Sequence, residues 1–232
     1  MSAASHPRSD DARSALLRAA ISEFAAQGEA GARTDAIAKA AGVNKALLHY
    51  YFGTKESLYA AVLDTILAGL KERYLGLLEG PGTAGWRMLL YVLANFDRMA
   101  ASGDHARILG HEMMRARAGT SASLPRMVQA YFGPLHAVVC RTLEEGVRSG
   151  EFQPLEPSHM ALSLAGANLF YFLSAPVFSE ITGRDPRDPE LLARRRSAIL
   201  DHAASLVFAD REAGRALARK VLADPPSSVP EP

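Results

Sequence analysis

The sequence predicts an all-α protein, and three observations carry this prediction. The 232 residues contain no sustained alternation of apolar and polar residues, and no Asn-Gly or Asp-Gly turn between β-branched runs. Segments with apolar residues three and four positions apart follow one another, separated by short stretches of Gly, Pro or Ser. Hydrophobic residues make up 48% of the chain, which is enough for a sizeable core.

Four helices are predicted in the first third of the chain, because caps and glycines mark their ends. Thr34 can cap a short helix and Asn44 can cap the next one. Gly42 breaks the shorter of the two, and Gly53 and Thr54 open a long fourth helix. The approximate ranges are 9–28, 34–40, 44–52 and 54–74.

Five further helices are predicted after the Gly-Pro-Gly break at residues 80–82. Asp188 and Pro189 mark a helix start, because proline suits the first helical position after a capping residue. Pro134 lies inside a stretch that otherwise reads as one helix, so we expect a kink there. The approximate ranges are 83–101, 105–118, 124–149, 157–174 and 189–209, and residues 211–223 suit one polar helix.

Residues 34–58 have the pattern of a helix-turn-helix. A short helix is followed by a three-residue turn, Ala41-Gly42-Val43, and by a second short helix. Leu48 and Phe52 supply apolar contacts that fix the crossing of the two helices. The residues left exposed on the second helix are Asn44, Lys45, Ala46, Leu47, His49, Tyr50 and Tyr51.

Positive charge is concentrated in this segment. Between residues 33 and 55 there are four basic residues and one acidic residue, a net charge of +3, whereas the whole chain has a formal net charge of +1. Local positive charge supplies the sequence-independent, salt-sensitive part of DNA binding. Phosphate oxygens can also accept hydrogen bonds from Thr34, His49, Tyr50 and Tyr51, and from free backbone N–H groups where helices begin at Thr34 and Thr54.

The same region resembles the DNA-binding domain of the tetracycline-repressor (TetR) family. The resemblance is carried by ALLRAAISEFAAQG in the first helix, TDAIA at residues 34–38, AGVNK at 41–45 and LHYYFGTKE at 48–56. It covers about residues 10–70. A less specific resemblance to the companion domain of that family is carried by PRMVQAYFGP at 125–134 and LEEGVRSGEF at 143–152.

The resemblance implies that the helix from Asn44 to Tyr51 enters the major groove of DNA. Leu47 departs from the family pattern, in which threonine or another polar residue is common. A leucine cannot hydrogen-bond a base edge, but it can pack on a thymine methyl group. Our hypothesis is that base discrimination rests on Asn44, Lys45 and the apolar pair Ala46-Leu47. The resemblance also implies phosphate contacts from Thr34, Lys45, His49, Tyr50, Tyr51 and Lys55.

The predicted organisation has four parts. They are a flexible arm at residues 1–9, a helix-turn-helix DNA-binding domain at 10–55, a helical effector-binding and dimerisation domain at 56–210, and a polar tail at 211–232 whose end is disordered.

The second domain carries aromatic and methionine side chains that suit either ordinary core packing or an internal pocket. The family resemblance implies a small-molecule effector site there. The candidate lining residues are Trp86, Tyr91, Phe96, His111, Met114, Tyr131, Phe132, His136, Asn168, Phe170 and Tyr171.

The run MALSLAGANLFYFLSA at residues 160–175 is apolar nearly all the way round, so its helix needs cover on two sides. One side can be its own core, and the other is most economically a second copy of the chain. A two-fold dimer would place two reading helices on successive major-groove faces of a palindrome. The candidate interface residues are Leu164, Phe172, Leu192, Ile199 and Leu206.

These features predict a sequence-specific transcriptional regulator that binds a palindromic operator. The family resemblance implies a repressor that is released from it by a small-molecule effector. Its partners would be double-stranded DNA, a second copy of itself and the effector, with no cofactor. The alternative is a helical enzyme, or a partner-binding scaffold that does not bind DNA.

Enzyme signatures are missing from the sequence. There is no G-x-S-x-G elbow, Gly-rich phosphate loop or C-x-x-C pair. The run HEMMR at residues 111–115 has arginine where the zinc motif H-E-x-x-H needs its second histidine, so we predict no metal site. We expect Cys140 to be a buried, inert thiol. The N-terminus has no secretory h-region and no apolar run reaches the ~20 residues of a membrane span, so we expect a cytoplasmic protein.

Overall fold

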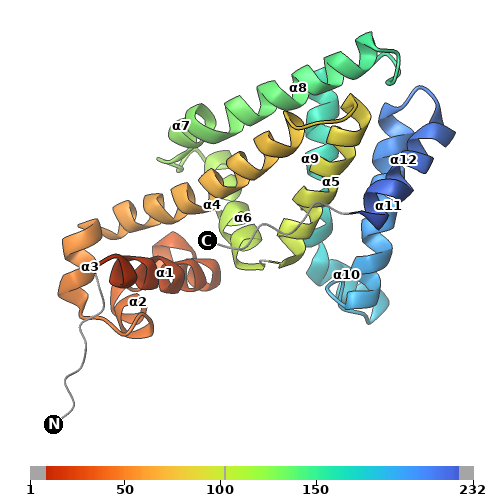
Figure 1. Ribbon diagram of the computed structural model, residues 1–232. Helices are drawn as coiled ribbons and strands as arrows, with labels where there is room; N and C mark the ends of the chain where they lie inside the picture. Colours follow the sequence, from red (N-terminus) through yellow and green to blue (C-terminus); the bar gives the residue numbers. More distant parts are fainter. Residues whose placement is uncertain (1–8, 102, 225–232) are drawn as a thin grey trace. The chain divides into compact units, whose positions relative to one another are not determined.

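The computed structural model describes residues 9–101 and 103–224, and the regular elements in these ranges are helices. The predicted all-α class is confirmed; the one β-type contact in this part of the chain is an isolated bridge between Phe152 and Phe208. In chain order (Figure 1) the helices are α1 (Ser9–Gly31), α2 (Thr34–Ala40), α3 (Lys45–Phe52), α4 (Lys55–Leu78), α5 (Ala84–Ala101), α6 (Gly103–Arg117), α7 (Leu124–Met127), the π-helix η1 (Val128–Phe132), α8 (Gly133–Arg148), α9 (Pro157–Leu173), α10 (Ala175–Thr182), α11 (Pro189–Val207) and α12 (Arg211–Ala223).

The chain divides into two compact units. Unit 1 comprises Met1–Ala68 and Asp104–Met127, and unit 2 comprises Gly69–Gly103 and Val128–Pro232. These boundaries differ from the predicted ones, because α4 continues past residue 56 and α6 belongs with the N-terminal helices. The predicted flexible arm falls almost entirely on residues 1–8, and the predicted disordered end on 225–232, both outside the described residues.

The core of unit 1 is built where α1, α2, α3 and the first half of α4 meet. Leu16, Phe24, Ile37, Leu48 and Leu58 are completely buried there. Gly42 in the turn between α2 and α3 has φ +68°, a left-handed conformation that favours glycine. The helix-turn-helix predicted from the sequence is therefore present, with the apolar faces of both short helices turned inward.

Helix α6 is tied into unit 1 by a network around Glu112, whose side chain is only 1% exposed. The Glu112 carboxylate accepts hydrogen bonds from the Tyr59 hydroxyl, at 2.9 Å, and from Ser121. Arg115 lies one turn further along α6 and pairs with Glu112, at 3.7 Å, and with Glu29 of α1. Burial, with the charge of Glu112, raises the pKa of Tyr59. This Glu112 network joins α1, α4, α6 and the turn after α6.

Helix α5 is the central helix of unit 2 and packs against α8, α9, α11 and α12. Helix α12 was predicted as part of a polar tail, and this assignment is wrong. Ala218 and Val221 on α12 are 2% and 0% exposed, so its apolar face belongs to the core. Asp210 caps the helix by accepting hydrogen bonds from the backbone N–H groups of Glu212 and Ala213.

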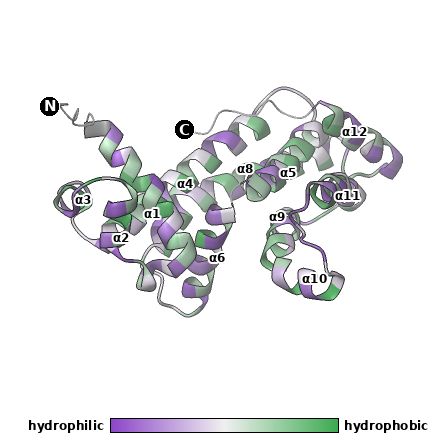
Figure 2. Cartoon of the chain, turned by 90° about the horizontal axis from the view of Figure 1, so that it is seen from below, coloured by the Kyte–Doolittle hydropathy of each residue, from purple (hydrophilic) through white to green (hydrophobic). Residues whose placement is uncertain are grey.

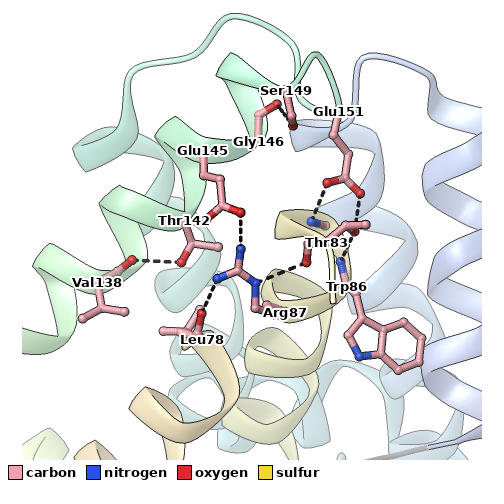
Figure 3. A network of polar contacts seen from close by, with 11 residues as sticks. Leu78, Thr83, Trp86, Arg87, Val138, Thr142, Glu145, Gly146, Ser149 and Glu151 are labelled. Carbon is pink, nitrogen blue, oxygen red and sulfur yellow. Dashed lines mark hydrogen bonds and ion pairs between the residues drawn. The ribbon is translucent and has the colours of Figure 1, made fainter. Parts of the chain in front are cut away.

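The turn after α8 explains the spacing of the run LEEGVRSGEF. Phe152 packs directly over Gly146, where an added Cβ would lie 2.1 Å from the Phe152 ring. Gly150 has φ +76°, which ends α8 in a left-handed conformation. Glu151 accepts hydrogen bonds from the Thr83 hydroxyl at 2.7 Å and from the Gly85 backbone at 2.9 Å, so it caps the start of α5 (Figure 3).

Arg87 joins three helices of unit 2 at the same end (Figure 3). Its guanidinium donates to the Leu78 carbonyl at the end of α4, at 2.8 Å, and to the Glu145 carboxylate on α8. The cation therefore satisfies a carbonyl at the end of α4 that has no partner within the helix.

The predicted kink at Pro134 takes the form of a π-helical turn. Proline has no N–H group, so the Ala130 carbonyl four residues earlier lacks its usual helical donor. The Lys71 ammonium on α4 donates to that carbonyl at 3.0 Å. The single predicted helix at 124–149 is accordingly divided into α7, η1 and α8.

Helix α10 was not predicted, because its eight residues lie in a stretch too short to show a clear period. It ends at Gly183, which has φ +66°. Among the described residues no single helix is long and apolar enough to cross a membrane; α9 and α10 meet that measure only when joined, and they are bent by 57°.

Candidate DNA-binding interface

The start of α3 is fixed by Asn44. Its side-chain oxygen accepts a hydrogen bond from the Ala46 backbone N–H at 2.9 Å, which confirms the predicted cap. Leu48 and Phe52 point into unit 1, and this leaves Lys45 and Ala46 exposed on the outer face. The cap uses one lone pair of the Asn44 oxygen and leaves its amide N–H groups as donors for a base.

Lys45 on α3 pairs with Asp35 on α2 across the outside of the helix-turn-helix. The ammonium lies 2.8 Å from the carboxylate, and both side chains are about half exposed, at 47% and 60%. A hydrogen bond from Lys45 and its charge lower the pKa of Asp35. Asp35 therefore stays anionic and competes with a phosphate group for the same ammonium.

The second turn of α3 begins with three adjacent ring residues, His49, Tyr50 and Tyr51. Tyr50 is 80% exposed, and its ring meets that of Tyr51 edge to face at 5.2 Å. His49 is exposed, but its Nδ1 lies 2.9 Å from the Gly53 carbonyl oxygen. This contact orients the imidazole so that only Nε2 can face a phosphate group.

Lys55 was predicted to contact phosphate, but the structure gives its ammonium another role. Nζ donates to the carbonyl oxygens of Ala30, at 3.0 Å, and Ala32, at 3.3 Å. These carbonyls lie at the end of α1, where a cation is favourable. At most one N–H of Lys55 is left for DNA.

The two predicted helix N-termini also differ from expectation. Thr34 is the first residue of α2 rather than its cap; Arg33 holds the cap position and makes no side-chain capping bond. At the start of α4, the Thr54 hydroxyl accepts from the Ser57 N–H, at 3.1 Å. The Glu56 carboxylate accepts from its own backbone N–H, which lowers its pKa. The start of α4 is thus already occupied by an anion and is a poor phosphate site.

Sequence reasoning missed two charged residues of this surface. It did not recognise Asp35 as the partner of Lys45, because the two lie ten residues apart on different helices. It also missed Arg13 on α1, an exposed residue whose guanidinium lies over the Phe52 ring at 5.5 Å from the ring centre. No local pattern identifies either contact.

The predicted effector-pocket residues are divided between the two units. His111 and Met114 lie exposed on α6 in unit 1. Phe132 and Phe170 are 40% and 68% exposed, so they do not line an internal pocket. Tyr131 is only partly buried, on η1.

The remaining candidates belong to unit 2, but two of them lie apart from the others. Trp86, in the first turn of α5, packs on Gly82. His136 Nε2 lies 3.5 Å from Cys140 Sγ and 3.3 Å from Ser158 Oγ. Burial raises the pKa of the Cys140 thiol. Tyr91, Phe96 and Asn168 are buried in the core of unit 2, and the partly buried Tyr171 packs against Phe96.

Of the predicted interface residues, Leu164 and Phe172 lie on α9, and Leu192, Ile199 and Leu206 lie on α11. Leu164 and Phe172 are 2% and 7% exposed, and Ile199 on α11 is 1% exposed, because all three pack into the core of unit 2. Leu192 and Leu206 are only partly buried against that core. A group of exposed apolar side chains lies on the other face of α9 and on α10: Leu162, Phe170, Leu173, Val177 and Ile181. Figure 2 shows apolar stretches, in green, along the ribbons of both helices.

A groove of about 360 Å³ lies at the turn between α11 and α12, where Phe208 and Leu217 supply apolar walls. Its two carboxylates already cap helices, Glu151 at α5 and Asp210 at α12. None of the predicted pocket residues lines it. Within the described residues, no group of three or more His, Cys, Asp or Glu side chains is placed to hold a metal ion.

Comparison with known proteins gives the same assignment for both halves of the chain. Residues 16–62 match the family described as "Bacterial regulatory proteins, tetR family", and residues 87–202 match "Tetracyclin repressor-like, C-terminal domain". The HTH-type transcriptional regulator RutR of Escherichia coli K12 is 29% identical over 186 residues, covering 76% of this chain and 81% of RutR.

Two further proteins are similar over most of their length. The HTH-type transcriptional repressor NicS of Pseudomonas putida KT2440 is 26% identical over 190 residues, covering 80% of this chain and 87% of NicS. The structure of the ketosteroid transcriptional regulator KstR2 of Mycobacterium tuberculosis shares the fold, with a TM-score of 0.68 at 18% identity, over 85% of this chain and 95% of that one. With its capped, exposed α3 in a helix-turn-helix, the chain belongs to the TetR family of bacterial regulatory proteins and is a DNA-binding transcriptional regulator.

Proposed function

We propose that the protein is a homodimeric repressor that binds a palindromic operator through α3 and is released from it by a small-molecule effector. The observation that carries the DNA-binding part is the outer face of α3, where a capped helix start presents Lys45 and Ala46 to solvent. The repressor NicS is a relative over most of the chain, which supports repression rather than activation.

The first turn of α3 reads the bases in this proposal. Lys45 and the Asn44 amide N–H groups are polar donors available there. Ala46 and the half-buried Leu47 offer apolar contact to a thymine methyl group. Tyr50, with most of its side chain exposed, contacts the phosphate backbone and fixes the orientation of the helix.

Lys45 and Asp35 provide opposite tests of this surface. Lys45→Ala removes a cation and leaves Asp35 unpaired, so we expect weaker DNA binding and a salt slope of log Kd smaller by about 1. Asp35→Asn frees the ammonium and removes an anion, so binding should tighten. Fluorescence anisotropy with a labelled duplex, titrated with salt, measures both changes.

The control is Lys220, an exposed lysine on α12 in unit 2. Lys220→Ala should leave the affinity and the salt slope unchanged. Equal salt slopes of log Kd for wild type, Lys45→Ala and Asp35→Asn would show that α3 does not contact the DNA.

The dimer uses the exposed apolar face of α9 and α10 in this proposal. Leu162, Phe170 and Leu173 repeat at the spacing of one helix face, and each is at least 60% exposed. Val177 and Ile181 continue the same spacing on α10. The opposite face of α9 packs into the core, so this helix is apolar on both sides, as a helix between its own core and a partner would be.

Phe170→Asp should therefore convert the dimer into a monomer. A two-fold axis places the change in the interface twice, so we expect the dimer Kd to rise at least about 100-fold. Sedimentation at micromolar concentration measures it. The control is Met113→Asp on α6, since Met113 is comparably exposed at 55% but lies off this face. A monomeric wild type, or a Phe170→Asp variant that stays dimeric, would contradict this interface.

A further inference from the structure

Four of the buried polar side chains in unit 2 come from helices around its apolar core. Asn168 is 0% exposed, Tyr74 3%, Tyr91 5% and Asn95 9%. They come from three helices, α4, α5 and α9, and we call them the asparagine cluster. The DNA-binding surface makes no use of them, and buried amides require hydrogen-bond partners.

Within the described residues, one acceptor atom of the asparagine cluster, Asn168 Oδ1, has no hydrogen-bond donor. Asn168 Nδ2 donates to the Val92 carbonyl at 3.0 Å and to Asn95 Oδ1 at 2.9 Å. Asn95 Nδ2 in turn donates to the Tyr74 hydroxyl, at 3.4 Å. Asn168 Oδ1 is buried and has no partner among the described residues. Exchanging the two atoms of the Asn168 amide would set its oxygen against two other oxygens, so this orientation is fixed.

The cluster is uncharged. Burial raises the pKa of Tyr74 to about 12, although the Asn95 hydrogen bond and the charges of Arg98 and Arg73 act in the opposite direction. Burial also raises the pKa of Tyr91. Both phenols are therefore neutral at physiological pH, and the charges of Arg98 and Arg73 that act on Tyr74 are positive.

The unused oxygen of Asn168 favours a ligand group that donates a hydrogen bond. A carboxylate has only acceptors and would place a lone pair against Asn168 Oδ1. An ammonium group would meet the positive charges of Arg98 and Arg73, which act on Tyr74. A neutral N–H or O–H donor suits the unused oxygen, and apolar atoms suit the rings of Phe96 and Phe172 in the same core.

We propose that the asparagine cluster is the effector-recognition site, and that the effector is a small uncharged molecule whose amide-like N–H or hydroxyl group donates to Asn168 Oδ1. This inference rests on the proposed effector response. The unpaired Asn168 oxygen is the reason for placing the effector here. A buried acceptor without a donor is unfavourable, and a donor group of a ligand relieves that cost.

The sequence offers a direct test, since it contains only three asparagines: Asn44, Asn95 and Asn168. Full-length protein labelled with ¹⁵N at asparagine gives three side-chain amide pairs, each assigned by substitution. The probes are benzamide and cyclohexanecarboxamide, each with its N,N-dimethyl amide and its carboxylate. We expect the primary amides to shift the signals of Asn95 and Asn168 and to leave Asn44 unchanged. The donor-blocked amides and the carboxylates should bind about tenfold more weakly or not at all.

Asn168→Leu removes the acceptor and should reduce amide binding about tenfold, measured by the shift in melting temperature. The matched control is Thr142→Val, because Thr142 is also buried in unit 2 and its hydroxyl bonds only its own helix, at the Val138 carbonyl. It should bind the amides like wild type. If Asn168→Leu does not fold, the comparison of primary amides with dimethyl amides on the wild-type protein still tests the proposal.

Three results would overturn the proposal. They are equal binding of primary and dimethyl amides, no shift of Asn168 with any amide, and a crystal structure in which a buried water alone bonds Asn168 Oδ1 while amides bind elsewhere. DNA binding by the unliganded protein is measured separately on the same samples. Loss of the amide response with DNA binding intact rejects this site only, whereas absence of DNA binding rejects the proposed function.

Discussion

Replacing Glu112 with alanine is expected to destabilise the protein by about 3 kcal/mol, because it removes the centre of a buried polar network. Tyr59 and Ser121 would each lose the acceptor for their hydroxyl, and Arg115 would lose one of its two carboxylate partners, keeping Glu29 and the Thr120 carbonyl. Buried donors without partners carry the full cost of desolvation. Urea denaturation at a fixed protomer concentration measures the change.

Asp104 is the matched control for Glu112, since it lies on the same helix but is 39% exposed. Its ion pair with Arg107 is a surface contact, so Asp104→Ala should change stability by less than about 1 kcal/mol. A double-mutant cycle with Tyr59→Phe and Glu112→Gln gives the coupling energy directly. A Glu112→Ala variant as stable as Asp104→Ala would mean that the network does not hold α6 in unit 1.

Gly146→Ala is expected to destabilise the protein by about 2 kcal/mol, although the same change in a helix interior ordinarily stabilises by up to about 1 kcal/mol. The added Cβ would lie 2.1 Å from the Phe152 ring, which is itself 2% exposed and meets the Phe208 ring edge to face. The ring has no free space to move into, so the turn after α8 must distort. Thermal and urea unfolding both report the loss.

The matched control is Gly69→Ala on α4, where an added Cβ would meet no atom within 4 Å. This variant should gain about 0.5–1 kcal/mol, because alanine restricts the unfolded chain and fits the helix. The two substitutions therefore have opposite predicted signs. If Gly146→Ala were as stable as Gly69→Ala, the close packing of Phe152 over Gly146 would not be real.

Local sequence signals predicted the helices well, because caps and periodicity act within one turn of the chain. The cap at Asn44 was found in this way, as was the irregularity at Pro134. Long-range contacts were not predicted. Lys55 looks like a phosphate ligand in sequence, but the end of α1 lies 23 to 25 residues earlier and captures its ammonium.

The faces of α9 show a second limit of the sequence. Its two apolar stripes have similar hydropathy, and only the packing of unit 2 decides that Leu164 and Phe172 lie inside while Leu162 and Phe170 lie outside. The polar residue Asn168 lies on the inner stripe, so polarity does not identify which face of α9 meets solvent. Helix α6 was placed in the second domain for a similar reason, because its partner Tyr59 lies 53 residues away.

The most direct measurement is selection of bound duplexes from a random pool at low ionic strength, with wild-type protein and Lys45→Ala in parallel. The proposed function predicts that wild type enriches a palindrome whose half-sites lie about 10 base pairs apart or a multiple of it, and that the variant enriches it less. Failure of the wild-type protein to enrich any duplex would contradict the role of α3 as a DNA-reading helix.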